Sequence, residues 1–182
     1  MKININLPVT GEVLGKCLAI NEAVRVRIGT VILFGPTGNS SPHVTLLMGE
    51  VAEGHVAQVQ EKVHGIISEL PRPLAVRFGA PYREIVTGRY IFSDVVVPGE
   101  VRRWRSQLQA VVSEYFFSTA RMTEDELHLT LGVLEEADAQ IDGYLASLPA
   151  LGQSVISGVD ISVAGAKGAK LDLIEHLVID GA

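Results

Sequence analysis

The fold of this chain is decided by the stretch Pro42-His43-Val44-Thr45-Leu46-Leu47-Met48-Gly49, which has a counterpart in the second half of the sequence. The counterpart is Leu127-His128-Leu129-Thr130-Leu131-Gly132-Val133-Leu134. Each copy contains His-x-Thr-Leu inside an apolar run, and the two copies are separated by close to half of the 182 residues. A repeat at this spacing predicts a chain built from two similar halves.

Each copy is typical of a β-strand in which side chains alternate between the two faces. His43 and Thr45 then share one face, and Val44 and Leu46 anchor the other. The same holds for the second copy. Polar side chains in a buried strand need partners. One copy alone is typical of a core histidine with satisfied nitrogens, whereas the pair in matching context favours a functional site.

A helix is predicted after each copy, and each helix ends at a proline. Apolar residues recur at three-and-four spacing over 56–70, before Pro71, and over 141–148, before Pro149. The order strand, helix, proline therefore occurs twice, which strengthens the prediction of a duplicated architecture.

The doubled motif resembles the signature of the 2H phosphoesterase superfamily, which includes the bacterial 2'-5' RNA ligase-like proteins and cyclic nucleotide phosphodiesterases. The resemblance implies an α+β fold with pseudo-twofold duplication, in which two antiparallel sheets frame a central cleft and the helices lie outside. It also implies that residues 1–182 form a single domain of two intertwined lobes, each carrying one His-x-Thr motif.

Two histidines and two threonines suit displacement at phosphorus, in which the attacking and leaving oxygens lie on opposite sides of the phosphorus atom. One imidazole can act as general base and the other as general acid near neutral pH, which predicts a bell-shaped dependence of rate on pH. Threonine hydroxyls can donate hydrogen bonds to the non-bridging oxygens. This arrangement requires no metal ion and no cofactor.

The resemblance implies hydrolysis of nucleoside or RNA 2',3'-cyclic phosphates to 2'-phosphates, with reversible 2'-5' RNA ligation when a 5'-hydroxyl replaces water. It assigns catalysis to His43 and His128 and phosphate binding to Thr45 and Thr130, without saying which histidine is the base. Bacterial ligase-like members often have a basic residue soon after the second motif, where this chain continues with residues 132–136, Gly-Val-Leu-Glu-Glu. In this respect the second motif resembles the eukaryotic nucleotide-binding branch.

Further candidate substrate-binding residues lie around the predicted loop 79–88. Tyr82, Arg83, Arg89 and Tyr90 form an aromatic and cationic set that could stack on a base or pair with phosphate. A solvated hairpin is the simpler interpretation of these four residues. The glycine-rich loop 35–41 precedes the first motif and could lend backbone N–H groups to a phosphate.

Composition limits the partners that we expect. The formal net charge of −6 disfavours a protein that binds long nucleic acid by neutralising many phosphates, but it allows a small cyclic phosphate, a nucleotide or an RNA end. No apolar run reaches the roughly 18 residues of a membrane span. We therefore expect a cytoplasmic, monomeric protein that does not bind membranes. The single cysteine, Cys17, is predicted to be a small buried hydrophobe.

The remaining segments predict additional elements. Strands are expected over 2–9, 74–78, 89–97, 155–163 and 171–179, and helices after Thr10 and after Pro98. One or two strands, broken near Gly29, are expected over 24–34. In the second helix Trp104 belongs to the apolar stripe, whereas Arg105 is expected on a solvated face. Three carboxylates within 123–126 could raise the pKa of the second-motif histidine, and a solvated loop is the simpler interpretation.

Two rival functions use the same motifs. The first is a non-catalytic nucleotide-binding module, in which the four residues hold a phosphate without turnover. The second is a metalloenzyme with His43, His128 and a carboxylate such as Glu50 or Glu135 as ligands, although neither motif has a common metal-ligand spacing. Turnover and its sensitivity to chelation would separate these possibilities.

Overall fold

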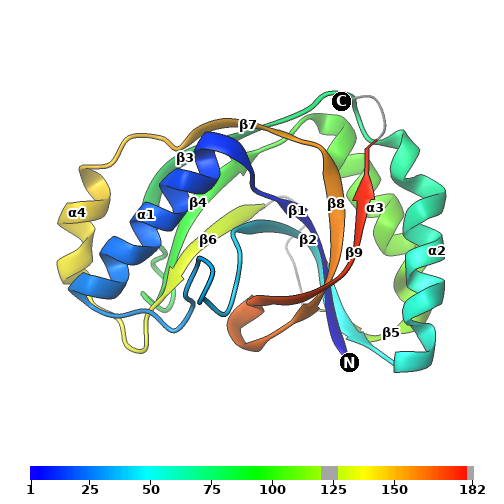
Figure 1. The fold of residues 1–182 in the computed structure, drawn as a ribbon, viewed down its shortest axis with the longest axis horizontal. Helices are drawn as coiled ribbons and strands as arrows, with labels where there is room; N and C mark the ends of the chain where they lie inside the picture. The colour runs from blue at the N-terminus through cyan, green and yellow to red at the C-terminus, as the bar shows by residue number, and fades with distance from the viewer. Residues whose placement is uncertain (120–126, 180–182) are drawn as a thin grey trace.

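A computed structural model describes residues 1–119 and 127–179 (Figure 1). In these residues nine strands form one curled sheet, and four α-helices lie outside it. The helices are α1 (Gly11–Arg27), α2 (Val56–Ile66), α3 (Gly99–Val112) and α4 (Asp142–Ala146). The strands are β1 (Lys2–Pro8), β2 (His43–Val51), β3 (Leu74–Arg83), β4 (Tyr90–Val96), β5 (Phe116–Thr119), β6 (His128–Val133), β7 (Gly152–Ile156), β8 (Gly158–Ala164) and β9 (Lys170–Val178).

The sheet is antiparallel, with the order β7-β3-β4-β6-β2-β1-β8-β9, and β5 also pairs with β2. We call β2, β1, β8, β9 and β5 the first half, and β6, β4, β3 and β7 the second half. The halves meet where β2 and β6 share one pair of opposed residues, Val44 and Leu129. The two predicted antiparallel sheets are therefore present as two halves of one sheet, and the α+β fold is confirmed.

The helices lie outside the sheet, as expected (Figure 1). In the second half α1 packs on β6 and β7, and α4 packs on β3. In the first half α3 packs on β2, and α2 packs on α3. Both helices that follow the motifs, α2 and α4, form where the apolar spacing predicts them. None of the helices in the described part of the chain is long and apolar enough to cross a membrane.

The buried core includes two side chains that the sequence marks as core residues. Trp104 is fully buried, and its indole Nε1 donates a hydrogen bond to the Ile66 carbonyl at 2.7 Å, which joins α3 to α2. Cys17 is fully buried on α1, and burial raises the pKa of its thiol to about 12. A thiol with such a pKa is inert near neutral pH, which confirms Cys17 as a small hydrophobe.

The prediction of one or two strands over 24–34, broken near Gly29, is wrong. Helix α1 continues to Arg27 because its buried stripe extends from Val13 through Cys17 to Val24 at helical spacing, which outweighs the β-branched composition. Residues 28–42 then form a loop, and its Ile32 carbonyl accepts a hydrogen bond from the Asn21 side chain. Tertiary contacts have replaced strand pairing here.

The predicted solvated position of Arg105 is also wrong. Its side chain is only 9% exposed, and its Nε donates to the Leu46 carbonyl at 2.8 Å. The carbonyl belongs to β2, on which α3 packs, so the guanidinium is buried with a hydrogen-bonding partner.

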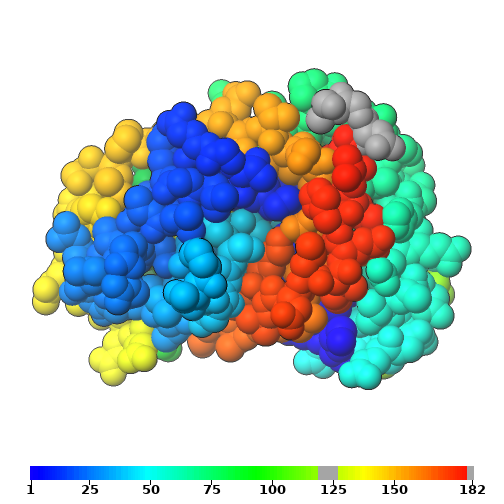
Figure 2. All heavy atoms as spheres, viewed as in Figure 1, coloured from blue at the N-terminus to red at the C-terminus, as the bar shows by residue number. Residues whose placement is uncertain are grey.

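The loop 28–42 leads the chain to the first motif and packs beside the turn between β8 and β9, as the light-blue and orange-red surfaces of Figure 2 show. The Lys170 backbone N–H donates to Ser40 Oγ at 2.9 Å across this contact. Three amides of the loop 35–41, which the sequence offers as phosphate ligands, are engaged within the loop itself. The Asn39 and Ser40 N–H groups donate to the Leu33 carbonyl, and the Gly38 N–H donates to the Gly35 carbonyl.

Candidate active site

The two motifs cross at their middle residues. Val44 and Leu129, which separate histidine from threonine in each copy, are the opposed pair that joins β2 to β6. Because the strands are antiparallel, each histidine lies toward the threonine of the other copy. The histidines and threonines of both copies line one pocket of about 390 Å³, together with Lys2, Met48, Tyr90, Phe92, Lys167 and Gly168.

The predicted alternation holds for both copies. His43 and Thr45 are half-buried and line the pocket, whereas Val44 and Leu46 are fully buried on the other face. The second copy shows the same pattern over 128–131. One strand face therefore supplies an imidazole and a hydroxyl from each half.

A β-bulge follows the threonine in both halves. Between β1 and β2 the register skips Leu46, and between β4 and β6 it skips Leu131. Bulges bend a strand and re-aim its side chains. In β2 the extra residue makes Met48, instead of Leu47, the next side chain to reach the pocket.

Each skipped residue leaves a backbone carbonyl that a buried helix side chain satisfies. Arg105 of α3 donates to the Leu46 carbonyl, and Asn21 Nδ2 of α1 donates to the Leu131 carbonyl at 2.9 Å. An unsatisfied buried carbonyl would be costly, so these two contacts stabilise the bulged shape of the motif strands. The duplication thus extends from the motif to the way the helices support it.

His43 is held as a neutral imidazole with a defined tautomer. Its Nδ1 lies 2.7 Å from the Ser41 carbonyl, which can only accept, so Nδ1 carries the proton. Its Nε2 lies 3.0 Å from the Asn4 amide Nδ2, which can only donate, so Nε2 carries the lone pair. Burial and, to a smaller extent, the Lys170 ammonium lower the pKa of His43 to about 4. This is the protonation state of a general base.

Asn4 connects the histidine to the threonine of the first copy. Its side chain is fully buried on β1, and Nδ2 also donates to Thr45 Oγ1 at 3.0 Å. Thr45 therefore accepts from Asn4 and keeps its own O–H free to donate. Sequence reasoning missed Asn4, although a signal was present, since Asn4 and Asn6 interrupt an otherwise apolar strand, Ile3-Asn4-Ile5-Asn6-Leu7.

His128 has an aromatic environment. The Phe92 ring lies 4.1 Å from the His128 ring between centroids, and Tyr90 stacks on Phe92 at 5.5 Å. Asp94 lies opposite His128 on β4. A neighbouring pocket of about 560 Å³ shares Phe92 and His128 with the pocket lined by the two motifs, which we call the motif pocket. The site therefore continues past these two side chains.

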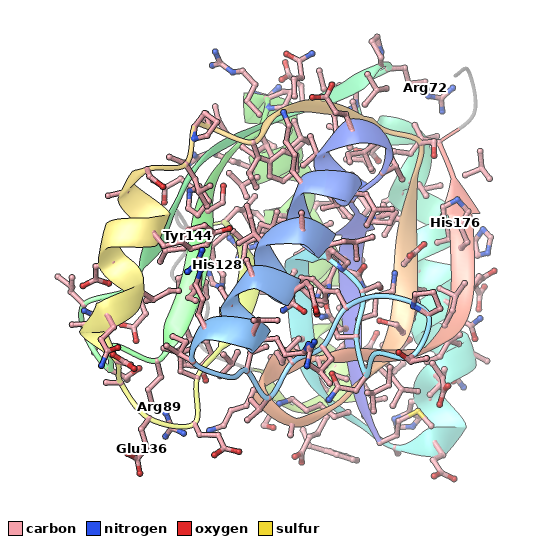
Figure 3. All side chains as sticks on the ribbon, turned by 60° about the vertical axis from the view of Figure 1, so that its left-hand side comes forward. Arg72, Arg89, His128, Glu136, Tyr144 and His176 are labelled. Carbon is pink, nitrogen blue, oxygen red and sulfur yellow. The ribbon has the colours of Figure 1, made fainter. Side chains whose placement is uncertain are left out.

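The other predicted substrate-binding residues divide into two groups. Tyr90 lines the pocket of the motifs, and Tyr82 lines the neighbouring pocket, where its hydroxyl donates to Asp94 at 2.8 Å. Arg83 pairs with Asp142 at 2.6 Å, and Arg89 Nε donates to the Leu134 carbonyl at 3.2 Å. Neither arginine lines the motif pocket, and Figure 3 shows Arg89 at the lower edge of the molecule, far from His128.

Two lysines of the pocket, Lys2 and Lys167, were not among the predicted site residues. Lys2 begins β1, and Lys167 belongs to the turn between β8 and β9. Neither has a sequence motif, and only the folded sheet brings the two ends together at the pocket.

No group of three or more histidine, cysteine or carboxylate side chains suited to hold a metal ion occurs within residues 1–119 and 127–179. The rival ligand set of two histidines with Glu50 or Glu135 is therefore not assembled there. The acidic segment 123–126 lies outside the described residues.

Comparison with known proteins supports the fold. No protein-family model and no curated protein sequence matches the chain. Among solved structures, a protein of Thermus thermophilus matches with 18% identity and a TM-score of 0.72, covering 100% of this chain and 99% of that one.

E. coli LigT complexed with 3'-AMP matches with 13% identity and a TM-score of 0.58, covering 99% and 98% of the two chains. The MHV ns2 PDE domain matches with 15% identity and a TM-score of 0.56, covering 76% and 81%. These neighbours are 2H phosphoesterases. The strand order, the crossing of the two motifs and these matches together show that the chain has the 2H phosphoesterase fold.

Proposed function

We propose that this protein is a metal-independent phosphoesterase that opens 2',3'-cyclic phosphates of nucleosides or RNA ends to 2'-phosphates. In this proposal His43 is the general base, His128 is the general acid, and Thr45 and Thr130 bind the non-bridging phosphate oxygens. With a 5'-hydroxyl in place of water, the same site would support reversible 2'-5' RNA ligation.

The observation that carries the proposal is the antiparallel crossing of β2 and β6 at Val44 and Leu129. It brings one imidazole and one hydroxyl from each half into a single pocket, on opposite sides of the crossing. An in-line reaction at phosphorus needs proton transfer at two opposed oxygens, and two pseudo-symmetric histidines meet that need.

The state of His43 supports its assignment as the base. Its unprotonated Nε2 accepts the proton of the attacking water as the new P–O bond forms. The bond from phosphorus to O3' breaks, and protonated His128 donates its proton to that oxygen. The product is a 2'-phosphate with a free 3'-hydroxyl, and exchange of a proton with solvent restores both histidines.

The walls of the pocket support a nucleotide substrate. Tyr90 and Phe92 offer rings on which a base can stack, and Lys2 and Lys167 provide positive charge. The pocket volume lies within the range of about 300–1,000 Å³ common for small-molecule sites. The structural match to LigT complexed with 3'-AMP supports the same ligand class.

A non-catalytic nucleotide-binding module is the second candidate, and one contact favours it. The Asn4 amide occupies the lone pair of His43 Nε2, so an attacking water must displace Asn4 before the base can act. If Asn4 stays in place when the ligand binds, the pocket would hold a nucleotide without turnover.

Turnover of the four nucleoside 2',3'-cyclic monophosphates in EDTA tests the proposal, with the product identified by NMR. We expect hydrolysis to a 2'-phosphate by the wild type and its loss in His43→Gln and His128→Gln. His64→Gln is the matched control, because His64 lies exposed on α2 in a pair with Glu175. Binding without turnover would favour the module, and activity that EDTA abolishes would favour a metalloenzyme.

A further inference from the structure

The charge of the motif pocket is opposite to that of the whole chain. The formal net charge of the protein is −6, yet the residues that line the pocket include Lys2 and Lys167 and no carboxylate. Neither lysine forms an ion pair with a carboxylate of the described residues. A concave site lined by one sign of charge concentrates ligands of the opposite sign.

Both lysines belong to the first half, whereas the aromatic rings belong to the second. Lys2 lies on β1 and Lys167 in the turn between β8 and β9, while Tyr90 and Phe92 lie on β4. The two walls of the pocket therefore differ in chemistry, one cationic and one aromatic. A ligand that fits both walls carries a planar ring at one side and negative charge at the other.

The backbone of Lys167 adds a second, independent observation. Its φ of 57° and ψ of 23° place it in the left-handed region, and it is the one non-glycine residue with positive φ in the described part of the chain. Such a conformation costs about 1–3 kcal/mol and persists mainly at functional positions. A glycine or asparagine would fit this turn more easily, so the presence of a lysine indicates a use for its side chain.

The position of Lys2 separates it from the groups that would bind the reacting phosphate. Asn4 contacts both His43 and Thr45, and Lys2 lies two residues before Asn4, about 7 Å away along β1. The hydroxyls and imidazoles at the strand crossing already supply the donors for the reacting phosphodiester. The positive charge of the lysines is therefore available to a different anionic group of the same ligand.

We propose that Lys2 and Lys167 form a binding subsite for a second anionic group, so that the preferred substrate is a 2',3'-cyclic phosphate whose nucleoside also carries a 5'-phosphate or 5'-diphosphate. This inference rests on the proposed phosphoesterase function. The 5' carbon of a nucleoside projects away from its 2',3' edge, which places its phosphate outside the strand crossing. A simple nucleoside cyclic monophosphate leaves this subsite empty.

The test compares kcat/KM for adenosine 2',3'-cyclic phosphate and for its 5'-phosphorylated form. We expect the wild type to prefer the 5'-phosphorylated substrate by about tenfold, the size of one hydrogen bond to a charged group. In Lys167→Asn and Lys2→Gln the ratio of the two values should fall toward one. Asparagine tolerates the left-handed turn, so Lys167→Asn removes the charge without straining the backbone. Lys62→Gln, on the exposed surface of α2, is the matched control and should keep the ratio.

Two results would overturn the inference. A wild type without preference for the 5'-phosphorylated substrate would show that no second anion is bound. Equal losses for both substrates in the lysine variants would show that the lysines hold the reacting phosphate.

If the wild type hydrolyses neither substrate, the proposed function fails, and binding then decides the inference separately. Adenosine 3',5'-bisphosphate should bind more tightly than 3'-AMP in a calorimetric titration, and Lys167→Asn should remove the difference. Equal affinities would overturn the subsite.

Discussion

The two halves of the sheet share a backbone device but surround it with different chemistry. Both have a His-x-Thr strand with a bulge after the threonine. In both, a buried helix side chain donates a hydrogen bond to the carbonyl of the residue skipped at the bulge. Opposite the motif, β1 places Asn6 across from Thr45, whereas β4 places Phe92 across from Thr130. Duplication has kept the geometry that presents two imidazoles and has allowed their environments to diverge.

The different surroundings explain how the same motif could supply a general base in one half and a general acid in the other. A carbonyl at Nδ1 and the Asn4 amide at Nε2 fix the first histidine as a neutral imidazole whose lone pair accepts from that amide. An aromatic ring packs against the second histidine. A reaction that needs one base and one acid uses two histidines in opposite protonation states, and different surroundings of the two rings favour that difference.

The largest expected effect is the loss of turnover when the histidine of either half is replaced. His43→Gln and His128→Gln should each lower kcat by about 10²–10⁴-fold, the usual contribution of a general base or acid. The pH profiles should separate the roles, because His43→Gln removes the limb at low pH and His128→Gln removes the limb at high pH. Residual rates of each variant measured between pH 4 and 9 in ~0.1 M salt check this assignment. Loss of the same limb in both variants would contradict it.

Asn4→Asp tests whether the amide beside His43 keeps its imidazole neutral. Replacing the donating amide with a carboxylate would stabilise the imidazolium of His43, so the pKa of His43 should rise by about 1–3 units from its value near 4. The low-pH limb of kcat/KM should move upward with it, and NMR titration of the His43 ring should show the same shift. The equivalent change at Asn21, which lies on α1 near the other motif, should leave this limb in place. An unmoved limb in Asn4→Asp would show that His43 is not the base.

The carbonyl contacts behind the bulges can be tested through stability. Asn21→Leu and Arg105→Met should each lower the free energy of unfolding in urea by about 1–3 kcal/mol, because each leaves a buried carbonyl without a donor. Arg103→Met, on the exposed face of α3, should change it by no more than about 0.5 kcal/mol. A value for either buried variant as small as that of the control would mean that the freed carbonyls find other donors.

The sequence predicts the parts of the fold that depend on local pattern. The alternation around His43 and His128 and the helices after them follow from side-chain periodicity. The placement of both motifs in one cleft is what the family resemblance implies. The prediction of one or two strands over 24–34 fails, because the buried stripe of α1 and the Asn21 side chain decide that segment through tertiary contacts.

The remaining site residues depend on contacts between distant segments. Arg105 is buried because a bulge in β2 presents a carbonyl to it, and no local sequence pattern predicts that bulge. Lys2 and Lys167 meet at the pocket only after β1 pairs with β8. By contrast, Asn4 was detectable, since a polar residue at strand period in an apolar run indicates a buried partner.

The smallest expected effect concerns the pH dependence of stability. Above about pH 6.5 the His43 imidazole is neutral in both the folded and the unfolded chain. Between about pH 6.5 and 4 the unfolded chain binds a proton that folded His43 does not, so the free energy of unfolding should decrease as pH falls through this window. His43→Gln should flatten that part of the curve by a slope equivalent to at most about one proton. His64→Gln, at an exposed position, provides the comparison. Urea unfolding at intervals of about half a pH unit measures both slopes. If the His43→Gln curve is as steep as that of the wild type, the first half does not hold a neutral imidazole, and the difference between the two walls would have to act on catalysis through the second half alone.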